Sequence, residues 1–141
     1  MPMSKTDREA FLAGVHVGIV AIPDAEHGPL AVPIWYDYTP GGDVVLITDR
    51  GSLKGRLLAK ASRISLVAQT ETAPYKYVSV EGPFTVESSD LERDLRPMAR
   101  RYLGERGGDG YIKATGGDSG REGSILVRMR PERWLSVDYG G

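Results

Sequence analysis

Six apolar segments of strand length, most of them separated by short connections, constrain this chain more than any other feature. They occupy residues 15–22, 30–38, 43–48, 64–70, 75–87 and 124–137. Successive parallel strands need a crossover of a dozen or more residues, whereas antiparallel strands need only a turn. Only residues 88–123 form a long connection, and the others leave room for short helices at most. We therefore predict a mainly β chain whose six strands form an antiparallel barrel.

Length and composition narrow the class of protein. At 141 residues the chain predicts one domain, residues 1–141, and it has no cysteine for a disulfide or a thiolate metal site. Its net charge of -1 argues against nucleic-acid binding. The N-terminal segment lacks the apolar core of a signal peptide, and no apolar run reaches the ~20 residues of a membrane span. We therefore expect a cytoplasmic protein.

Local sequence features predict the position of some strands in the sheet and the interruption of others. Segment 15–22 is apolar on both faces, which is typical of a central strand. Pro33 cannot donate a ladder hydrogen bond, so segment 30–38 is expected at an edge or bulged. We expect a bend near Gly82 and Pro83 in segment 75–87, and an interruption at Pro131 in the last strand.

The segment after residue 88 divides into two expected parts. Ser89 and Glu92 form a capping-box pattern, followed by apolar residues at helical spacing up to Leu103. Residues 104–120 are glycine-rich and polar, with GGDG and GGDSG elements, which predicts a mobile loop able to close over a ligand.

The stretch 48–69 carries the clearest functional signal. It holds five cations and no acidic residue between Asp49 and Glu71; the cations are Arg50, Lys54, Arg56, Lys60 and Arg63. A buried strand runs into a Gly51–Ser52 turn, and Ser52 is placed to cap a short helix. Strand, tight turn and helix start together favour binding of an anion such as phosphate. The alternative is a capped surface helix whose cations are solvated.

Other constellations carry little chemistry. His16 and His27 are the only histidines, and neither lies at metal-ligand spacing or beside a triad partner. The GGDG element lacks the strand and helix of a dinucleotide fingerprint and does not match a calcium loop. We expect no metal and assign no catalytic residue. The aromatic residues fit core, subunit interface or a stacking wall for a planar ring, and core or interface is favoured for any single one, since aromatic residues mostly serve packing; they are Trp35, Tyr36, Tyr38, Tyr75, Tyr77 and Trp134.

The order of these elements resembles the pyridoxamine 5′-phosphate oxidase-like split-barrel proteins. The resemblance runs from about Phe11 to Trp134 through GVHVGIVAI, PLAVPIWYDY, TDRGSLKGR and YKYVSVEGPFTVE. More narrowly, the chain resembles the actinobacterial flavin/deazaflavin oxidoreductases, the branch that includes users of coenzyme F420. The resemblance implies a six-stranded split β-barrel that forms a homodimer, with a cofactor site at each end of the subunit interface.

The resemblance also implies roles for particular residues. It places Pro33, Ile34 and Trp35 beside the cofactor ring, and Thr48, Ser52, Lys54 and Arg56 on its phosphate. Lys60 and Gln69 are further cofactor-binding candidates. Tyr77 or Trp134 of a second subunit is expected to complete the pocket.

The implied activity is hydride transfer from coenzyme F420 to an electron-poor small-molecule substrate, with chemistry supplied by the cofactor. FMN is the alternative cofactor. The surplus cations Arg50, Lys60 and Arg63 favour the deazaflavin, whose glutamate tail is anionic. The tail RPERWLSVDYGG does not reproduce the substrate-binding segments of the pyridoxamine phosphate oxidases proper. A non-catalytic flavin or tetrapyrrole carrier, or a structural dimer, would use the same fold differently.

Overall fold

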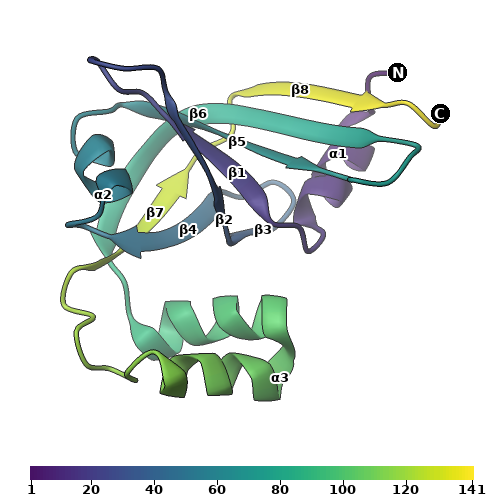
Figure 1. Ribbon diagram of the computed structural model, residues 1–141. Coiled ribbons are helices and arrows are strands. Elements are labelled where there is room, and N and C mark those ends of the chain that lie inside the picture. Colours follow the sequence, from purple (N-terminus) through teal and green to yellow (C-terminus); the bar gives the residue numbers. More distant parts are fainter.

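A computed structural model describes residues 1–141 (Figure 1). The chain begins with helix α1 (Lys5–Ala13), where the Ser4 hydroxyl accepts the Asp7 N–H at 3.1 Å, as a helix cap does. Leu12 points from this helix into the core and is fully buried. No helix in the chain combines the length and the apolar composition that crossing a bilayer requires.

The chain forms eight antiparallel strand segments, seven of which follow one path through the sheet. They are β1 (Gly18–Ile22), β2 (Leu30–Ile34), β3 (Tyr36–Tyr38), β4 (Val44–Asp49), β5 (Arg63–Gln69), β6 (Lys76–Ser88), β7 (Ser124–Met129) and β8 (Arg133–Asp138). Their order is β2-β1-β5-β6-β7-β4-β3, with β8 also beside β6. The two end strands, β2 and β3, are separated in sequence only by Trp35, so the sheet curls back on itself. This is the predicted antiparallel barrel, split between β2 and β3 (Figure 1).

The six predicted strands become eight because two of them are interrupted. Segment 30–38 divides at Trp35, and both halves are edge strands: β2 pairs only with β1, and β3 only with β4. The predicted edge position of Pro33 is confirmed. Segment 124–137 divides at Arg130–Glu132, around Pro131, again as predicted.

The long strand β6 belongs to both halves of the barrel. Tyr77 to Pro83 pair with β5, whereas Phe84 to Ser88 pair with β7. At the change of partner, a Cβ on Gly82 would lie 1.7 Å from the Arg130 carbonyl oxygen. Only glycine fits here, because the returning chain crosses directly over this residue. The core fills the barrel with inward-facing side chains of every strand, among them Val20, Ile22, Leu46, Leu66, Val78, Val80 and Val127.

The region after β6 corrects the sequence-based expectation. Residues 104–120 were expected to form a loop, but α3 (Arg96–Ala114) is helical as far as Ala114, and only 115–120 are turns. Gly104, with φ 77°, divides α3 into two antiparallel helices, the hairpin at the bottom of Figure 1. The hairpin forms because Gly108 lets the second helix approach Arg100 closely, and Ile112 is buried.

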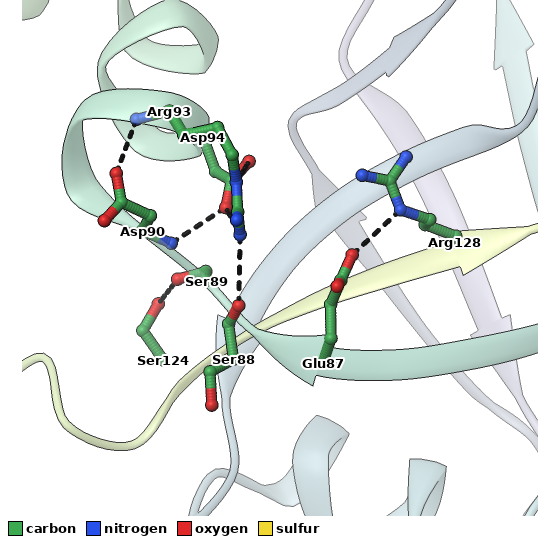
Figure 2. A network of polar contacts seen from close by, with 8 residues as sticks. All are labelled: Glu87, Ser88, Ser89, Asp90, Arg93, Asp94, Ser124 and Arg128. Carbon is green, nitrogen blue, oxygen red and sulfur yellow. Dashed lines mark hydrogen bonds and ion pairs between the residues drawn. The ribbon is translucent and has the colours of Figure 1, made fainter.

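The start of the hairpin is also shifted by one residue. A π-helical turn (Leu91–Leu95) precedes α3, and its cap is Asp90, not the predicted Ser89. The Asp90 carboxylate accepts the Arg93 N–H at 2.7 Å, and the Asp94 carboxylate accepts the Asp90 N–H at 2.8 Å (Figure 2). The Ser89 hydroxyl instead bonds the Ser124 hydroxyl at 2.6 Å. This pair joins the first residue after β6 to the start of β7.

Candidate functional site

A cavity of about 440 Å³ lies between the barrel and the helical hairpin. It lies at the start of β1 and at the ends of β2 and β4. The start of β7 lies beside the end of β4, because Asp49 pairs with Ser124. Its lining comes from both sides; it comprises Val17, Pro33, Ile34, Trp35, Ile47, Thr48, Asp49, Lys54, Leu95, Met98, Tyr111, Gly120, Arg121 and Ser124. The volume falls within the range of small-molecule sites, about 300–1,000 Å³.

The barrel wall of the cavity is formed at the split. Pro33, Ile34 and Trp35 line it together, at the point where β2 ends and β3 begins. The Trp35 ring stacks on Tyr102, with centroids 5.1 Å apart and planes 7° apart, and meets Tyr111 at 5.2 Å. This wall is flat and largely apolar, as a planar ligand requires.

One corner of the cavity is polar and charged. Thr48 and Asp49 end β4, and Lys54 comes from the following helix α2 (Leu53–Leu58). Ser124 and Arg121 face them from the segment that leads into β7. Lys54 and Arg121 are half-buried, and neither takes part in any ion pair of the chain. The corner therefore holds two unpaired cations against one carboxylate.

The turn into α2 satisfies part of its own polar groups. Ser52 caps the helix as predicted: its hydroxyl accepts the Gly55 N–H at 3.1 Å and donates to the Asp49 carbonyl at 2.6 Å. The Gly51 N–H bonds the Asp49 carboxylate at 2.8 Å. The Leu53 and Lys54 N–H groups donate to no acceptor within the chain. The expected backbone anion site is therefore narrowed to these two N–H groups and stays a prediction.

The structure brings together five of the nine predicted site residues. Pro33, Ile34, Trp35, Thr48 and Lys54 all line the cavity. The other four do not line it: Ser52 is engaged in the turn, Arg56 and Lys60 are exposed on and just after α2, and Gln69 is exposed at the end of β5. All nine assignments remain predictions of ligand contact.

Arg63 differs from the other cations of the stretch. Its guanidinium pairs with Glu81 at 2.7 Å and with Glu132 at 2.9 Å. Hydrogen bonds from Arg63 lower the pKa of both carboxyl groups below their usual value. Arg63 is therefore a structural cation of the β5–β6 region and is not available to a ligand tail.

Sequence reasoning missed the hairpin wall of the cavity, which Leu95, Met98 and Tyr111 form. The sequence signal for this wall was weak. Apolar positions 91, 95, 98, 99 and 102 predicted the first helix of the hairpin, but not the surface that this helix covers. Arg121 was missed because the glycine-rich pattern around it predicted a loop without a partner.

Two side chains fix the hairpin to the split of the barrel. The Tyr102 hydroxyl accepts the Tyr36 N–H at 2.9 Å and lies 2.5 Å from the His16 carbonyl oxygen, to which it donates. Burial raises the pKa of Tyr102, so the phenol keeps its proton. Arg101 donates to the carbonyl oxygens of Tyr36, Ala13 and Gly14 at 2.9–3.1 Å. The hairpin is thereby attached to the barrel by polar bonds at its far end.

A smaller hollow of about 270 Å³ adjoins the cavity under the same hairpin. Ile47 and Met98 line both spaces. The second hollow is more highly charged, and its ionised groups are Asp37, Asp43, Arg93, Asp94 and Arg128. Arg93 is paired with Asp94, and Arg128 with Glu87 (Figure 2).

The fold is shared with known structures, although the sequence matches no family profile and no curated protein. A protein named F420 reductase superimposes with TM-score 0.75 and 16% identity, over 90% of this chain and 94% of that one. A candidate pyridoxamine 5′-phosphate oxidase from Listeria innocua gives TM-score 0.68 and 11% identity, over 94% and 97%. The FAD and heme binding protein from Mycobacterium smegmatis gives 0.69 and 18%, over 98% and 72%. The chain therefore has the split-barrel fold of the pyridoxamine 5′-phosphate oxidase-like proteins.

Proposed function

We propose that this protein binds a flavin-type cofactor, a planar ring with a phosphorylated side chain, and acts as an oxidoreductase. One observation carries the proposal: a single cavity joins the flat apolar wall at Pro33–Trp35 to a corner that holds Lys54. A planar ring matches the first, and a phosphate matches the second. The names of the F420 reductase and of the FAD and heme binding protein support the same class of ligand.

We further propose coenzyme F420 as the cofactor, with an electron-poor small molecule as the hydride acceptor. Three cations that do not line the cavity, Arg50, Arg56 and Lys60, are exposed on the segment that also contributes Lys54, and they form no ion pair. Such a surface suits a polyanionic tail such as the glutamate tail of F420. FMN is the alternative, since its ring and phosphate would use the same two walls.

The chain's own residues would bind and orient the reactants. Pro33 and Trp35 provide a flat surface for the ring, and Lys54 and Thr48 supply a charge and a hydroxyl for the phosphate. Met98 and Tyr111 on the hairpin exclude water from the opposite face. The bound cofactor supplies the hydride chemistry, so no acid/base pair is required of the protein.

A second copy of the chain is proposed to cover the outer face of the sheet. Across β2, β1, β5, β6 and β8, one outward row consists of uncharged side chains; in register they are Pro33, Ile19, Val67, Ser79 and Leu135. Leu135 is 60% exposed. Tyr77 lies on the same outward face, whereas Trp134 packs within its own chain against Arg8 and Tyr38. Only Tyr77 stays a candidate for completing a neighbour's pocket. A monomeric mass in solution would contradict the dimer.

The test of the function is a parallel titration of the cofactor-free protein with F420, FMN and haem, followed by ligand fluorescence or absorbance. Tight F420 binding and weak FMN binding is the expected result. Preference for FMN would keep the site and change the cofactor, and binding of none would contradict the proposal. Turnover of reduced cofactor with a panel of acceptors then distinguishes an enzyme from a carrier.

Two matched variants locate the phosphate. Lys54→Ala is expected to weaken cofactor binding about tenfold or more, because a charge-assisted bond contributes about 1.5–3 kcal/mol. Arg56→Ala removes an equal charge from the exposed side of the same helix, and its effect on the binding of FMN, which has no glutamate tail, is expected to stay within about threefold, as for a solvated cation. Equal losses would show that net charge, not the cavity, determines affinity.

A further inference from the structure

Hydrogen bonds hold the Arg121 side chain against the turn that follows the hairpin. Its Nη2 donates to the Thr115 hydroxyl at 2.6 Å, and its Nε donates to the Gly117 carbonyl. Both acceptors belong to the turn that ends α3. Nη1 makes no hydrogen bond within the chain, and the side chain lines the cavity. Asp118 and Glu122 are close in sequence, yet neither pairs with the guanidinium.

Strand pairing places Arg121 in the same corner as Lys54. Asp49 at the end of β4 pairs with Ser124 at the start of β7, and the Arg50 N–H donates to the Gly123 carbonyl at 2.7 Å. The segment containing Arg121 therefore runs beside the turn that leads to Lys54. The one carboxylate of the corner, Asp49, is already engaged by the Gly51 N–H.

We propose that Arg121, supplied by the hairpin, acts with Lys54 as a two-cation site for a phosphoryl or carboxylate group of the bound ligand. Two half-buried cations that form no ion pair, beside a single carboxylate, leave a net positive charge that favours an anion from outside the chain. Arginine that is already oriented by two of its nitrogens loses little conformational entropy when a third group binds an oxyanion. The contact between Arg121 and the anion would therefore depend on the hairpin being in place.

The identity of the ligand rests on the proposed function, but the anion site does not. The probe is therefore pyrophosphate, titrated into the cofactor-free full chain at constant ionic strength and followed by the fluorescence of Trp35, which lines the cavity. Arg121→Gln is expected to weaken pyrophosphate binding about tenfold or more. Arg106→Gln is the matched control, because Arg106 is an exposed hairpin arginine; it should bind as the wild type does.

A loosened hairpin would mimic lost charge, so a third variant separates them. Arg121→Lys loses the bonds to Thr115 and Gly117 but keeps the charge, and it should recover most of the binding. If Arg121→Lys is as weak as Arg121→Gln, or if Arg121→Gln binds like Arg106→Gln, the inference is overturned. If pyrophosphate binding follows charge while no flavin-type cofactor binds, the anion site stands and the proposed function fails.

A second comparison in the same variants distinguishes a cofactor phosphate from a substrate carboxylate as the bound anion. If the site takes the cofactor phosphate, Arg121→Gln reduces the preference for FMN over riboflavin about tenfold. If it takes a substrate carboxylate, that preference stays, and the KM for a carboxylate-bearing acceptor rises relative to that for its neutral ester. Both outcomes support an oxyanion site, whereas unchanged values in both assays contradict it.

Discussion

The two walls of the cavity are built in different ways. The barrel wall belongs to a continuous hydrogen-bonded sheet with a fully buried core, so its geometry is fixed by many backbone bonds. The hairpin wall is attached to the barrel by the side chains of Arg101 and Tyr102 at its far end. One wall therefore unfolds only with the domain, while the other can separate from a folded barrel.

Glycine substitutions should separate the two walls most strongly. Gly82→Ala would drive a Cβ to 1.7 Å from the Arg130 carbonyl oxygen in the barrel, and we expect a loss of about 4 kcal/mol or more in the free energy of unfolding. Gly108→Ala would place a Cβ 2.6 Å from the Arg100 backbone nitrogen, inside the hairpin. It should disrupt the hairpin and leave the barrel folded.

The measurement for these variants is far-UV circular dichroism with chemical denaturation. Gly110→Ala is the control, since no atom lies within 4 Å of the added Cβ and alanine favours a helix over glycine by up to about 1 kcal/mol. If Gly108→Ala unfolds the strands as Gly82→Ala does, the two walls are one cooperative unit and the distinction is wrong.

A smaller effect is expected from the bond that attaches the hairpin. Tyr102→Phe keeps the stack on Trp35 but leaves the Tyr36 N–H without its partner, at a cost of about 1–3 kcal/mol. Hydrogen exchange should accelerate in residues 96–114 and stay slow in β5 and β6. The free energy of cofactor binding should weaken by a similar amount, about 1–3 kcal/mol. Uniform acceleration through the whole chain would contradict this prediction.

The smallest predicted effect is on the pH dependence of stability. Arg100 and Arg96 lower the pKa of Asp109 in the hairpin, and Arg63 lowers the pKa of Glu81 in the barrel. A carboxyl group whose folded pKa is depressed stabilises the fold above its unfolded pKa, 3.8 for Asp and 4.5 for Glu. That stability is lost as the pH falls through this value toward the folded pKa.

Two matched variants measure how much of this loss of stability at low pH arises in the hairpin and how much in the barrel. Asp109→Asn should flatten the acid-induced loss of hairpin structure below about pH 4, and Glu81→Gln should flatten the loss of barrel stability. Thermal unfolding at pH 7 and pH 3.5, followed by hydrogen exchange of each region, measures both. An Asp109→Asn variant with unchanged acid sensitivity in the hairpin would show that the pair with Arg100 contributes nothing.

The same contrast explains what the sequence could predict. Strand positions followed from local rules, because Pro33 excludes a central strand, Pro131 interrupts a ladder and Ser52 caps a helix wherever they stand. Trp35, Thr48 and Lys54 were grouped by the resemblance to the split-barrel proteins and not by a local rule, and all three line the cavity. The antiparallel barrel was predicted from the apolar segments and their connections, whereas the order of the strands was not.

The hairpin could not be predicted because its stability is not local. Gly107, Gly108 and Gly110 disfavour a helix on their own; the second helix forms because Gly108 fits against Arg100 and Asp109 bonds Arg96 and Arg100 across the turn. These contacts depend on an antiparallel partner that the pattern does not reveal. The contribution of Arg121 to the cavity was hidden for the same reason.

The central claim is that a flavin-type ligand binds between the two walls. The most direct test is amide hydrogen exchange of the full chain with and without F420, compared with FMN. We expect slower exchange in 33–35 and 48–54 on the barrel and, together with them, in 95–121 on the hairpin. Tight binding that protects neither wall, or the barrel wall alone, would contradict it.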